Sequence, residues 1–408
     1  MHRPMEGVRV LEVAQFTFVP AAGAVLADWG ASIIKVEHAE KGDAQRGLVR
    51  VLGYDATGSF APIMEGPNRG KRSIGLALDQ PEARPVVVEL IKNSDVFLTN
   101  FLPAARAKLG ITLADVRAIN PDIIYVSGSG FGSVGPDADK GGYDSTAFWA
   151  RGGSAFGSMP AGADEVSFMP AGAYGDNIGG ITIAGGIAAA LYGRAVTGEP
   201  SEVDVSLLGV GAWATQFSVN MALMRGEALA PRSADRRSQA AGNPLTGAYR
   251  TADDRWIQLS MLQARHYWPE FAHAIGRDDL VDDERFATDA LLAENYAVAM
   301  EIIGSVIAEK PLDDWRTAFA DIRGQWAVVQ DAWEIGTDEA LVANGRIAEV
   351  IDADGKTQHL VANPVKFDNA AVTLTRAPEF AEHTDEVLRE LGFDDEQLIE
   401  LKIAGAVT

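Results

Sequence analysis

Strand-like and helix-like segments alternate along the first third of the chain, and this alternation constrains the fold more than any other sequence feature. It begins with a strand pattern at residues 7–13, a helix pattern at 20–29 and a strand pattern at 32–37. Further strands are predicted at 73–78, 96–100 and 123–127, with helices at 81–92 and 113–119. The pattern predicts an α/β fold whose largely parallel sheet carries helices on both faces.

The first strand–helix–strand unit has the layout of a Rossmann-like domain, with acidic Glu37 closing the second strand. The glycine-rich phosphate loop of dinucleotide-binding domains is missing, however. The connecting segment reads A-Q-F-T-F-V-P, and its bulky Phe16 and Phe18 oppose close approach of a pyrophosphate to the backbone. The sequence therefore predicts a Rossmann-like sheet and disfavours NAD. Its ligand is expected beyond the carboxyl ends of the strands.

A change of composition near residue 245 indicates a second, smaller domain. A hairpin is predicted at 249–259, with a tight turn at Asp253-Asp254, and amphipathic helices follow at 268–275, 295–308 and 312–320. We predict a large domain at 1–224, a small α+β domain at 225–328, and a segment at 329–408 that returns to complete the large domain. A polar connector is expected at about 225–242.

The composition excludes several kinds of protein. The net charge of −22 disfavours nucleic-acid binding, and it requires a local basic island for any polyanionic ligand. The absence of cysteine excludes disulfides, thiolate nucleophiles and zinc–sulfur sites. The N-terminus lacks the apolar core of a signal peptide, and the uncharged run at 178–193 is short for a membrane span. We expect a soluble, cytoplasmic protein that does not bind membranes.

Nucleophile candidates are few. The chain has no G-x-S-x-G or H-E-x-x-H motif, and we predict no metal site. Two Asp residues follow glycine-rich loops, Asp144 in G-Y-D and Asp176 in G-D-N. Asp176 precedes an uncharged run at 178–192, which predicts a helix packed on every side with Asp176 at its N-cap position. Alone, each Asp fits a turn or capping residue better than a catalytic one.

Ten short motifs in order change that balance. The motifs are G-V-R-V-L-E-V, G-A-S-I-I-K-V-E, G-D-A-Q-R-G, N-R-G-K-R-S-I-G-L-A-L, N-F-L-P, L-G-I, N-P-D-I-I-Y-V-S-G-S-G-F-G, G-G-Y-D, G-D-N-I-G-G and E-H-T-D-E-V-L-R-E-L-G. In these motifs, from residue 7 to about 404, the chain resembles the family III coenzyme A transferases, the group of the carnitine and formyl-CoA transferases.

The resemblance implies a role for both Asp residues. Asp176 matches the family nucleophile, which forms a mixed anhydride with the acyl group and then an aspartyl-CoA thioester. Asp144 matches a second acidic position near the nucleophile, with a supporting role. The resemblance also implies acyl-CoA and a carboxylic acid as substrates, and an interlocked homodimer.

The resemblance further implies a set of coenzyme A contacts. These are Thr17, Phe18, His38, Leu76, Ala77, Leu78, Asp79, Asn100, Phe101, Lys108, Lys140, Gly141, Gly142 and Tyr143. His38 and Lys108 stand where formyl-CoA transferase has arginines, which predicts weaker or more pH-dependent phosphate contact. The cationic run at 69–72 fits either a basic island for the phosphates or a solvated turn.

Two alternatives stay open. Related racemases of α-methylacyl-CoA use a His before the first Asp, and Tyr143 at that position disfavours racemisation. A non-catalytic CoA-binding subunit is disfavoured by the presence of Asp176. The aromatic residues at 16–18 would narrow an acyl pocket or line it for an apolar acid. Phe148 and Trp149 fit core positions better, but as aromatic bulk beside that pocket they would favour larger or aromatic acids.

Overall fold

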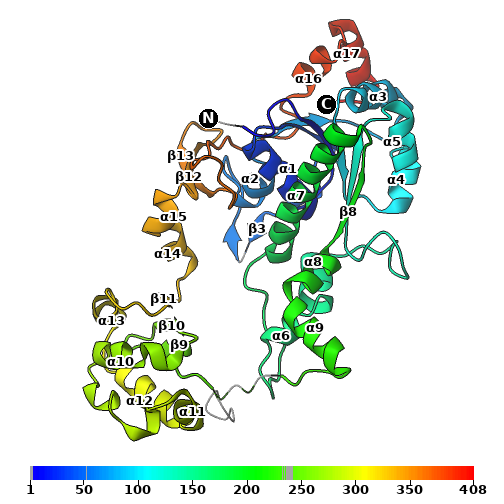
Figure 1. The fold of residues 1–408 in the computed structure, drawn as a ribbon. Coiled ribbons are helices and arrows are strands. Elements are labelled where there is room, and N and C mark those ends of the chain that lie inside the picture. Colours follow the sequence, from blue (N-terminus) through cyan, green and yellow to red (C-terminus); the bar gives the residue numbers. More distant parts are fainter. Residues whose placement is uncertain (1–2, 52, 232, 234, 236–241) are drawn as a thin grey trace. The chain divides into compact units, whose positions relative to one another are not determined.

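The computed structural model describes residues 3–51, 53–231, 233, 235 and 242–408 (Figure 1). The chain divides into two compact units. The large unit comprises Met1–Met159, Glu165–Leu229 and Thr337–Thr408, and the small unit comprises Pro160–Asp164 and Ala230–Gly336. The predicted connector at about 225–242 lies partly outside the described residues.

The large unit is built on a six-stranded sheet in the order β5-β2-β1-β6-β7-β8, with every neighbouring pair parallel. The strands are β1 (Arg9–Val13), β2 (Ser32–Glu37), β5 (Arg72–Gly75), β6 (Val96–Thr99), β7 (Ile124–Ser129) and β8 (Glu202–Ser206). The predicted parallel sheet is confirmed. β8 is not predicted by the sequence pattern, because it runs without a turn into the next helix, where Ser206 is the N-cap.

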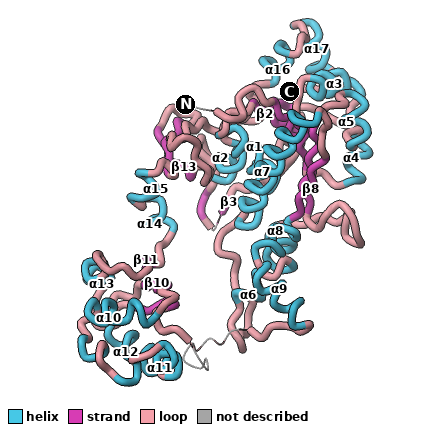
Figure 2. Tube along the Cα trace, viewed as in Figure 1, coloured by secondary structure: helices cyan, strands magenta, loops and turns pink. Residues whose placement is uncertain are grey.

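Alternate residues of the strands face two different helical layers, as the period of two in a strand requires. Val10 and Leu98 pack with α1 (Phe18–Asp28) and α7 (Tyr174–Thr197), whereas Leu11 and Phe97 pack with α3 (Arg84–Lys92) and α5 (Leu113–Ile119). Figures 1 and 2 show helices on both sides of the strands. The sheet is therefore buried between the layers, as expected for parallel strands.

The last segment of the chain adds to the second of these layers. Its helices α16 (Thr384–Glu390) and α17 (Asp395–Ile403) contribute Val387 and Leu398 to that core. The backbone N–H of His383 donates a hydrogen bond to the carbonyl of Ser73, at 2.9 Å. The C-terminal segment therefore packs beside β5.

Helix α7 packs one face on α1 and exposes the other. Gly180 permits the close approach, since a Cβ built there would lie 2.6 Å from the Cβ of Ala21. On the outer face Tyr192 is 73% exposed, so the prediction of a helix packed on every side is wrong: only one stripe of its small residues is used. By length and composition α7 could cross a membrane, but one face of it packs on α1 in the core of the large unit.

The remaining elements of the large unit are short. They are η1 (Ala44–Gly47), β3 (Arg50–Val51), β4 (Tyr54–Asp55), α2 (Pro62–Asn68), η2 (Pro81–Ala83), α4 (Pro103–Leu109), η3 (Asp144–Arg151), α6 (Ser154–Ser158), α8 (Leu207–Ala214), α9 (Gln216–Arg225), α15 (Glu339–Ala343), β12 (Ile347–Ile351) and β13 (Thr357–Val361).

The small unit packs helices against a three-stranded antiparallel sheet in the order β11-β10-β9. The predicted hairpin is confirmed, with Tyr249 opposite Ile257. Trp268 and Trp315 are buried at the centre of its core. Its elements are β9 (Thr246–Arg250), β10 (Trp256–Ser260), α10 (Ala264–Ala274), η5 (Asp278–Leu280), η6 (Glu284–Phe286), α11 (Asp289–Glu294), α12 (Tyr296–Ile307), α13 (Leu312–Ala318), β11 (Trp326–Val328) and α14 (Ala332–Gly336).

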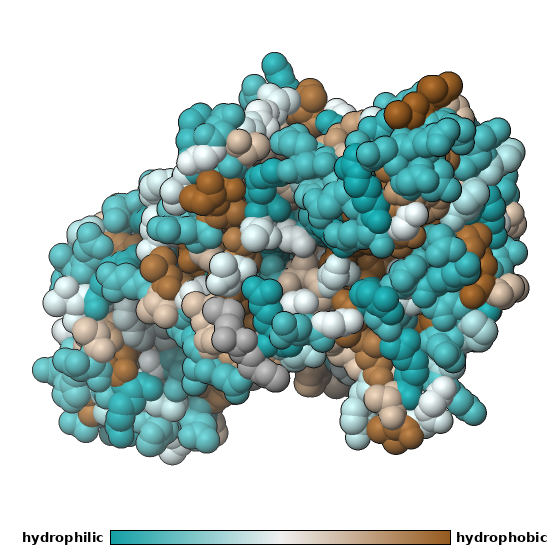
Figure 3. All heavy atoms as spheres, turned by 90° about the horizontal axis from the view of Figure 1, so that it is seen from above, coloured by the Kyte–Doolittle hydropathy of each residue, from teal (hydrophilic) through white to brown (hydrophobic). Residues whose placement is uncertain are grey.

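Figure 3 shows one face of the molecule, on which hydrophilic residues predominate and apolar residues form separate small groups. A surface of this kind accords with the net charge of −22.

Candidate active site

From β1 the chain adds strands first on one side of the sheet, toward β5, and then on the other, from β6 to β8, and parallel α/β sheets bind their ligands at such a switch point. The loop after β1 meets the end of β6 there. Asn100 Oδ1 accepts a hydrogen bond from the backbone N–H of Gln15 at 3.1 Å, and Asn100 Nδ2 donates one to the carbonyl of Gln15 at 2.6 Å. The predicted ligand contact of Asn100 is therefore replaced, in part, by a structural one: its amide fixes the loop.

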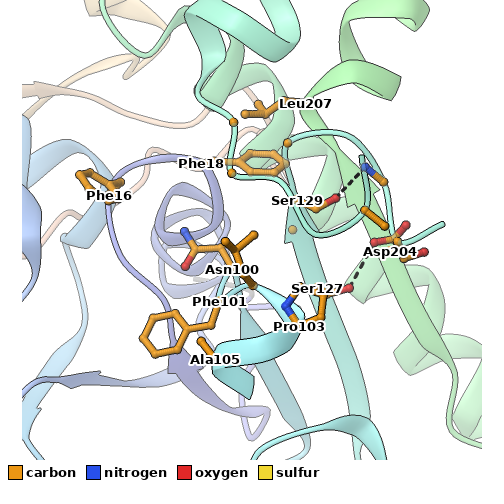
Figure 4. Close-up of a pocket in the computed structure, with 18 of the residues that line it drawn as sticks. Phe16, Phe18, Asn100, Phe101, Pro103, Ala105, Ser127, Ser129, Asp204 and Leu207 are labelled. Atoms are coloured by element: carbon orange, nitrogen blue, oxygen red, sulfur yellow. Dashed lines mark hydrogen bonds between the residues drawn. The ribbon is translucent and has the colours of Figure 1, made fainter. Parts of the chain in front are cut away.

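A cavity of about 420 Å³ opens at this point, and we call it the Asp176 cavity. Figure 4 shows side chains converging on it from the loop after β1, the ends of β6, β7 and β8, and the start of α8. The lining residues are Gln15, Phe16, Phe18, Asn100, Phe101, Leu102, Pro103, Ala105, Arg106, Ser127, Gly128, Ser129, Gly130, Gly132, Ser133, Ala138, Gly141, Gly142, Tyr143, Asp176, Asp204 and Leu207.

A second cavity, of about 250 Å³, adjoins the first, and we call it the His38 cavity. The two share Gln15, Phe101 and Ala105. The His38 cavity is lined further by Val36, Glu37, His38, Leu76, Leu78, Asp79, Lys108 and Leu109. Together the cavities form one path along the carboxyl ends of the strands.

Asp176 lies inside the first turn of α7 and does not cap the helix. The N-cap residue is Ala173, in a left-handed conformation with φ of 59°, and α7 starts at Tyr174 without a side-chain capping bond. The predicted N-cap position of Asp176 is therefore wrong, because the helix begins earlier. A capping role no longer accounts for this carboxyl group.

The environment of Asp176 stabilises its neutral form. Burial, first, and the negative charge of Asp144, second, raise the pKa of Asp176 to about 7. Among the described residues no Lys, Arg or His lies within ion-pair distance of it. A half-buried carboxyl group whose pKa lies near neutrality can carry chemistry in either protonation state.

Asp144 lies at the start of η3, beside the beginning of α7. Its Oδ1 accepts a hydrogen bond from the backbone N–H of Ser145 at 2.7 Å, while its buried Oδ2 has no hydrogen-bond partner among the described residues. Burial raises the pKa of Asp144, and the backbone N–H groups of Ser145, Gly175 and Tyr174 oppose that rise. The structure thus brings both predicted acidic residues together.

The structure places most of the predicted coenzyme A contacts along the two cavities. The Asp176 cavity holds Phe18, Asn100, Phe101, Gly141, Gly142 and Tyr143. The His38 cavity holds His38, Leu76, Leu78, Asp79, Phe101 and Lys108.

Three predicted contacts lie outside both cavities. The Thr17 side chain is buried and donates a hydrogen bond to Gln45 Oε1 at 2.9 Å. Ala77 is buried, and Lys140 Nζ pairs with Asp137 Oδ1 at 2.6 Å. None of the three side chains lines either cavity, and their contact with coenzyme A stays a prediction.

The cationic run at 69–72 is neither a basic island nor a solvated turn. Arg69 pairs with Asp28 at 2.7 Å, and Lys71 pairs with Glu12 at 2.7 Å. Arg72 reaches carboxylates of α16. All three side chains are paired within the large unit, so a phosphate would have to compete with these carboxylates.

Phe148 and Trp149 belong to the core of the large unit and do not line the cavity. Gly175 leaves space for Phe148, since a Cβ built there would lie 2.4 Å from its ring. The core position favoured for these rings is confirmed, and they add no bulk beside the pocket. The aromatic walls come from Phe16, Phe18 and Tyr143 instead.

Several residues that line the Asp176 cavity were not predicted from the sequence. Arg106 of α4 lines the cavity, with its Nη1 3.4 Å from the hydroxyl oxygen of Tyr125. Asp204 accepts a hydrogen bond from Ser127 Oγ at 3.2 Å (Figure 4). Asp204 and Leu207 could be predicted as cavity residues only if β8 had been predicted. The only sequence clue to Arg106 was its position two residues before the predicted contact Lys108.

Residues 5–384 match the family described as CoA-transferase family III. The chain belongs to that family. The transferase is 30% identical over 406 residues to (R)-2-hydroxy-4-methylpentanoate CoA-transferase of Clostridioides difficile, covering 98% of each chain. It is also 30% identical to cinnamoyl-CoA:phenyllactate CoA-transferase of Clostridium sporogenes, covering 97% of this chain and 95% of that one.

A solved structure supports the same assignment. The transferase matches a CaiB/BaiF family protein from Brucella suis with a TM-score of 0.80 and 26% identity, over 96% of this chain and all of that one. The resemblance drawn from the ten motifs is thus confirmed, and the transferase is an enzyme whose family uses acyl-CoA as substrate. No group of His, Asp or Glu in the described part of the transferase could hold a metal ion.

Proposed function

We propose that this transferase moves coenzyme A from an acyl-CoA to a carboxylic acid through covalent intermediates on Asp176. The observation that carries the proposal is a half-buried carboxyl group, without a cationic partner among the described residues, in a cavity at the switch point of the sheet. Its pKa of about 7 makes the ionised form a stronger base than an ordinary Asp, and therefore a better nucleophile.

The proposed reaction has two symmetrical halves. An Asp176 oxygen attacks the thioester carbonyl, and the carbon–sulfur bond breaks to give a mixed anhydride and CoA thiolate. The thiolate attacks the Asp176 acyl carbon, which releases the donor acid and leaves an aspartyl-CoA thioester. The acceptor carboxylate then attacks that thioester, and the carbon–sulfur bond breaks to give a second mixed anhydride and CoA thiolate. The thiolate attacks the acceptor acyl carbon of this anhydride, which forms the new acyl-CoA and releases the Asp176 carboxylate. No water enters the balance.

Each half-reaction passes through a negatively charged oxygen on a tetrahedral carbon. The backbone N–H groups at the start of α7 and the glycine-rich segments at 128–130 and 141–142 supply donors near Asp176. We assign Asp144 a supporting role, because its charge helps to set the pKa of Asp176.

The His38 cavity is the proposed site of the nucleotide end of coenzyme A. His38 Nδ1 accepts hydrogen bonds from the backbone N–H groups of Glu40 and Lys41, which leaves Nε2–H as a donor for a phosphate oxygen. Lys108 lines the same cavity and has no carboxylate partner among the described residues, so it can meet a phosphate as a point charge. The pantetheine arm would pass Gln15 and Phe101 toward Asp176.

The acid is proposed to carry an apolar group. The names of two relatives specify (R)-2-hydroxy-4-methylpentanoate and cinnamoyl or phenyllactate substrates, and the aromatic walls of the Asp176 cavity suit the apolar groups of these acids. Racemisation is not favoured, because Tyr143 has no titrating nitrogen to act as a base at that position.

We further propose a cytoplasmic homodimer. On α8 and α9 the side chains of Trp213 and Phe217 are 72% and 91% exposed, and Leu223 and Met224 are also exposed. A second copy of the chain is the occupant that the family resemblance suggests for this apolar surface. Light scattering across a concentration series tests it: a monomer at micromolar concentration would contradict the proposal.

The deciding experiment is intact-protein mass spectrometry after incubation with acyl-CoA, followed by hydroxylamine trapping and peptide mapping. A modification on Asp176 is expected. Asp176→Ala should fold, bind CoA and lose turnover by at least about 10³-fold, and retained transfer would remove Asp176 as the nucleophile. Asp122→Ala is the matched control, because Asp122 is exposed and precedes the amino end of β7, whereas the cavity lies at the carboxyl ends of the strands.

The racemase alternative has its own readout. Deuterium wash-in at the acyl α-carbon, without any adduct on Asp176, would replace the transfer mechanism by proton abstraction. Neither an adduct nor deuterium with a broad acyl-CoA panel would favour the non-catalytic subunit.

A further inference from the structure

Phe16 has an unusual backbone conformation at the rim of the Asp176 cavity. Its φ is 65°, in the left-handed region that a phenylalanine rarely adopts. Its backbone N–H donates a hydrogen bond to Asp43 Oδ1 at 3.1 Å. A conformation of this kind persists only where the surrounding structure enforces it, and such positions cluster at functional sites.

The group that holds Phe16 is itself held by a buried charge. Lys35 Nζ lies 2.8 Å from Asp43 Oδ2, and both side chains are fully buried. Lys35 Nζ also donates a hydrogen bond to the carbonyl of Ala14 at 2.9 Å. Lys35 therefore holds the loop after β1 twice, directly at Ala14 and through Asp43 at Phe16.

The neighbours of Phe16 are fixed as well. Asn100 exchanges two hydrogen bonds with the backbone of Gln15, and the Thr17 hydroxyl donates to Gln45. Where a dinucleotide-binding domain has a glycine-rich loop, this chain has a loop in which each residue from Ala14 to Thr17 has its own partner. Such a loop presents the Phe16 ring in one fixed place.

The Phe16 ring meets Tyr143 edge to face, with centroids 5.6 Å apart and planes at 90°. This is a preferred geometry for two aromatic rings. Both residues line the cavity that holds Asp176, and Tyr143 directly precedes Asp144. The pair thus links the fixed loop to the acidic end of the cavity, with Phe18 and Leu207 as further apolar walls.

We propose that the Phe16–Tyr143 pair selects apolar, aromatic acyl groups for transfer at Asp176, and that Asp43 is the positioning residue that keeps Phe16 in the pair. This inference rests on the proposed function. It specifies that Phe16 and Tyr143 contact the acyl group, and it attributes the position of Phe16 to the buried Asp43–Lys35 ion pair.

The test compares phenylacetyl-CoA with propionyl-CoA in single turnover, by release of the free acid, which needs no acceptor. Both probes share the CoA part, so the ratio of their specificity constants reports on the acyl group. The wild type should prefer phenylacetyl-CoA at least about tenfold, and Phe16→Asn should lower the ratio by about tenfold or more, since lost apolar contacts cost this much or more. Asn tolerates the left-handed conformation, so the variant keeps the backbone.

Phe16→Gly provides a second variant that removes the ring and relieves the backbone restriction. Phe156→Asn is the matched control, because it removes an exposed ring of α6 outside the cavity and should leave the ratio unchanged. A wild type without preference, or a ratio in the Phe16 variants within twofold of the wild type, would overturn the proposal.

Asp43 requires a readout that a purely structural role would not move. Asp43→Asn keeps an oxygen that accepts from the Phe16 N–H, whereas Asp43→Ala removes it. Both variants should lower the thermal stability, because Lys35 loses one of its two buried carboxylate partners, Asp43 and Glu12, but only Asp43→Ala should lower the phenylacetyl to propionyl ratio. Equal ratios in the two variants would exclude Asp43 as a positioning residue.

Failure of this inference is distinguishable from failure of the proposed function. If Asp176→Ala releases acid from both probes as the wild type does, the aspartyl mechanism is wrong. If Asp176→Ala is inactive while the Phe16 variants keep the wild-type ratio, the mechanism stands and the aromatic selection is wrong.

Discussion

Asp144 of η3 lies close enough to Asp176 of α7 for its negative charge to help raise the pKa of Asp176. Burial is the larger cause and the Asp144 charge the second, and together they raise the pKa of Asp176 to about 7. A carboxylate of this basicity is a better nucleophile than an exposed Asp, but it is available only when ionised. The pair therefore links reactivity to pH.

The first prediction concerns the pH dependence of kcat/KM. Because the pKa of Asp176 is raised, the group is protonated and inactive below about pH 7, and activity should rise with pH through that value. Asp144→Asn removes one of the two causes, so the rise should move to lower pH, while burial keeps it above the ordinary value for Asp. Asp139→Asn, an exposed residue outside the cavity, is the control. If the rise of kcat/KM occurs at the same pH in Asp144→Asn as in the wild type, the charge of Asp144 does not raise the pKa of Asp176.

The second prediction concerns stability. The folded pKa of Asp176 lies above its unfolded value of about 3.9, so its contribution to stability is present at low pH and is lost as the pH rises through about 7. Asp176→Asn should therefore stabilise the protein at pH 8, by up to about 4 kcal/mol, and less at pH 5. The cavity admits solvent, so this figure is an upper limit. Thermal unfolding by circular dichroism at both pH values measures it, and equal stabilisation at the two values would contradict the raised pKa.

The third prediction concerns Lys108. Lys108→Ala should raise the KM for acyl-CoA about tenfold and lower kcat much less, because one charged contact to a phosphate is lost far from the reacting carbon. Lys92→Ala is the control, since Lys92 is exposed on α3 and pairs with Glu89 outside both cavities. An unchanged KM in Lys108→Ala would place the phosphates elsewhere.

The fourth prediction concerns the contact of α7 with α1. Gly180→Ala should destabilise the large unit by about 1–3 kcal/mol, because its Cβ would lie 2.6 Å from Ala21 and 3.2 Å from backbone atoms. Gly185→Ala lies on the same helix with no atom within 4 Å of its Cβ, and it should stabilise by about 0.5–1 kcal/mol. Urea denaturation of the two variants gives the comparison. Equal changes in the free energy of unfolding for the two variants would mean that helix propensity, and not contact with Ala21, determines the effect of Gly180→Ala.

The coenzyme itself gives a fifth prediction. Thermal shift should show stabilisation by CoA and none by NAD. The segment after β1 contains Phe16 and Phe18, which line the cavity, and it lacks the glycines that would let a pyrophosphate approach the backbone. Stabilisation by NAD alone would revive the dinucleotide-binding interpretation.

Local patterns predicted the large unit well. The strand of residues 32–37 and the helix of 113–119 were predicted with the bounds that the structure has, because each has clear start and stop signals. The edge strand β8 was missed because it continues into α8 without a turn. Asp176 was misplaced as an N-cap because Ala173, which gives no sequence signal for a left-handed conformation, starts the helix earlier.

Tertiary contacts bear on two alternatives that the sequence left open. The cationic run at 69–72 fitted either a basic island or a solvated turn, but Asp28 and Glu12, both distant in sequence, pair with Arg69 and Lys71. Phe148 fitted either the core or the pocket, and its ring lies in the core against Gly175, where a Cβ would clash with it. Neither partner could be found by reading neighbours along the chain.

The sequence by itself determined the α/β fold class and the family, because hydrophobic periodicity and short ordered motifs are local properties. Only the tertiary structure decided which carboxyl group is half-buried without a cationic partner in the described residues, which cations are already paired, and how the loop after β1 holds Phe16. Those properties depend on the exclusion of water and on charges brought close by folding, and the order of residues along a chain does not contain either one directly.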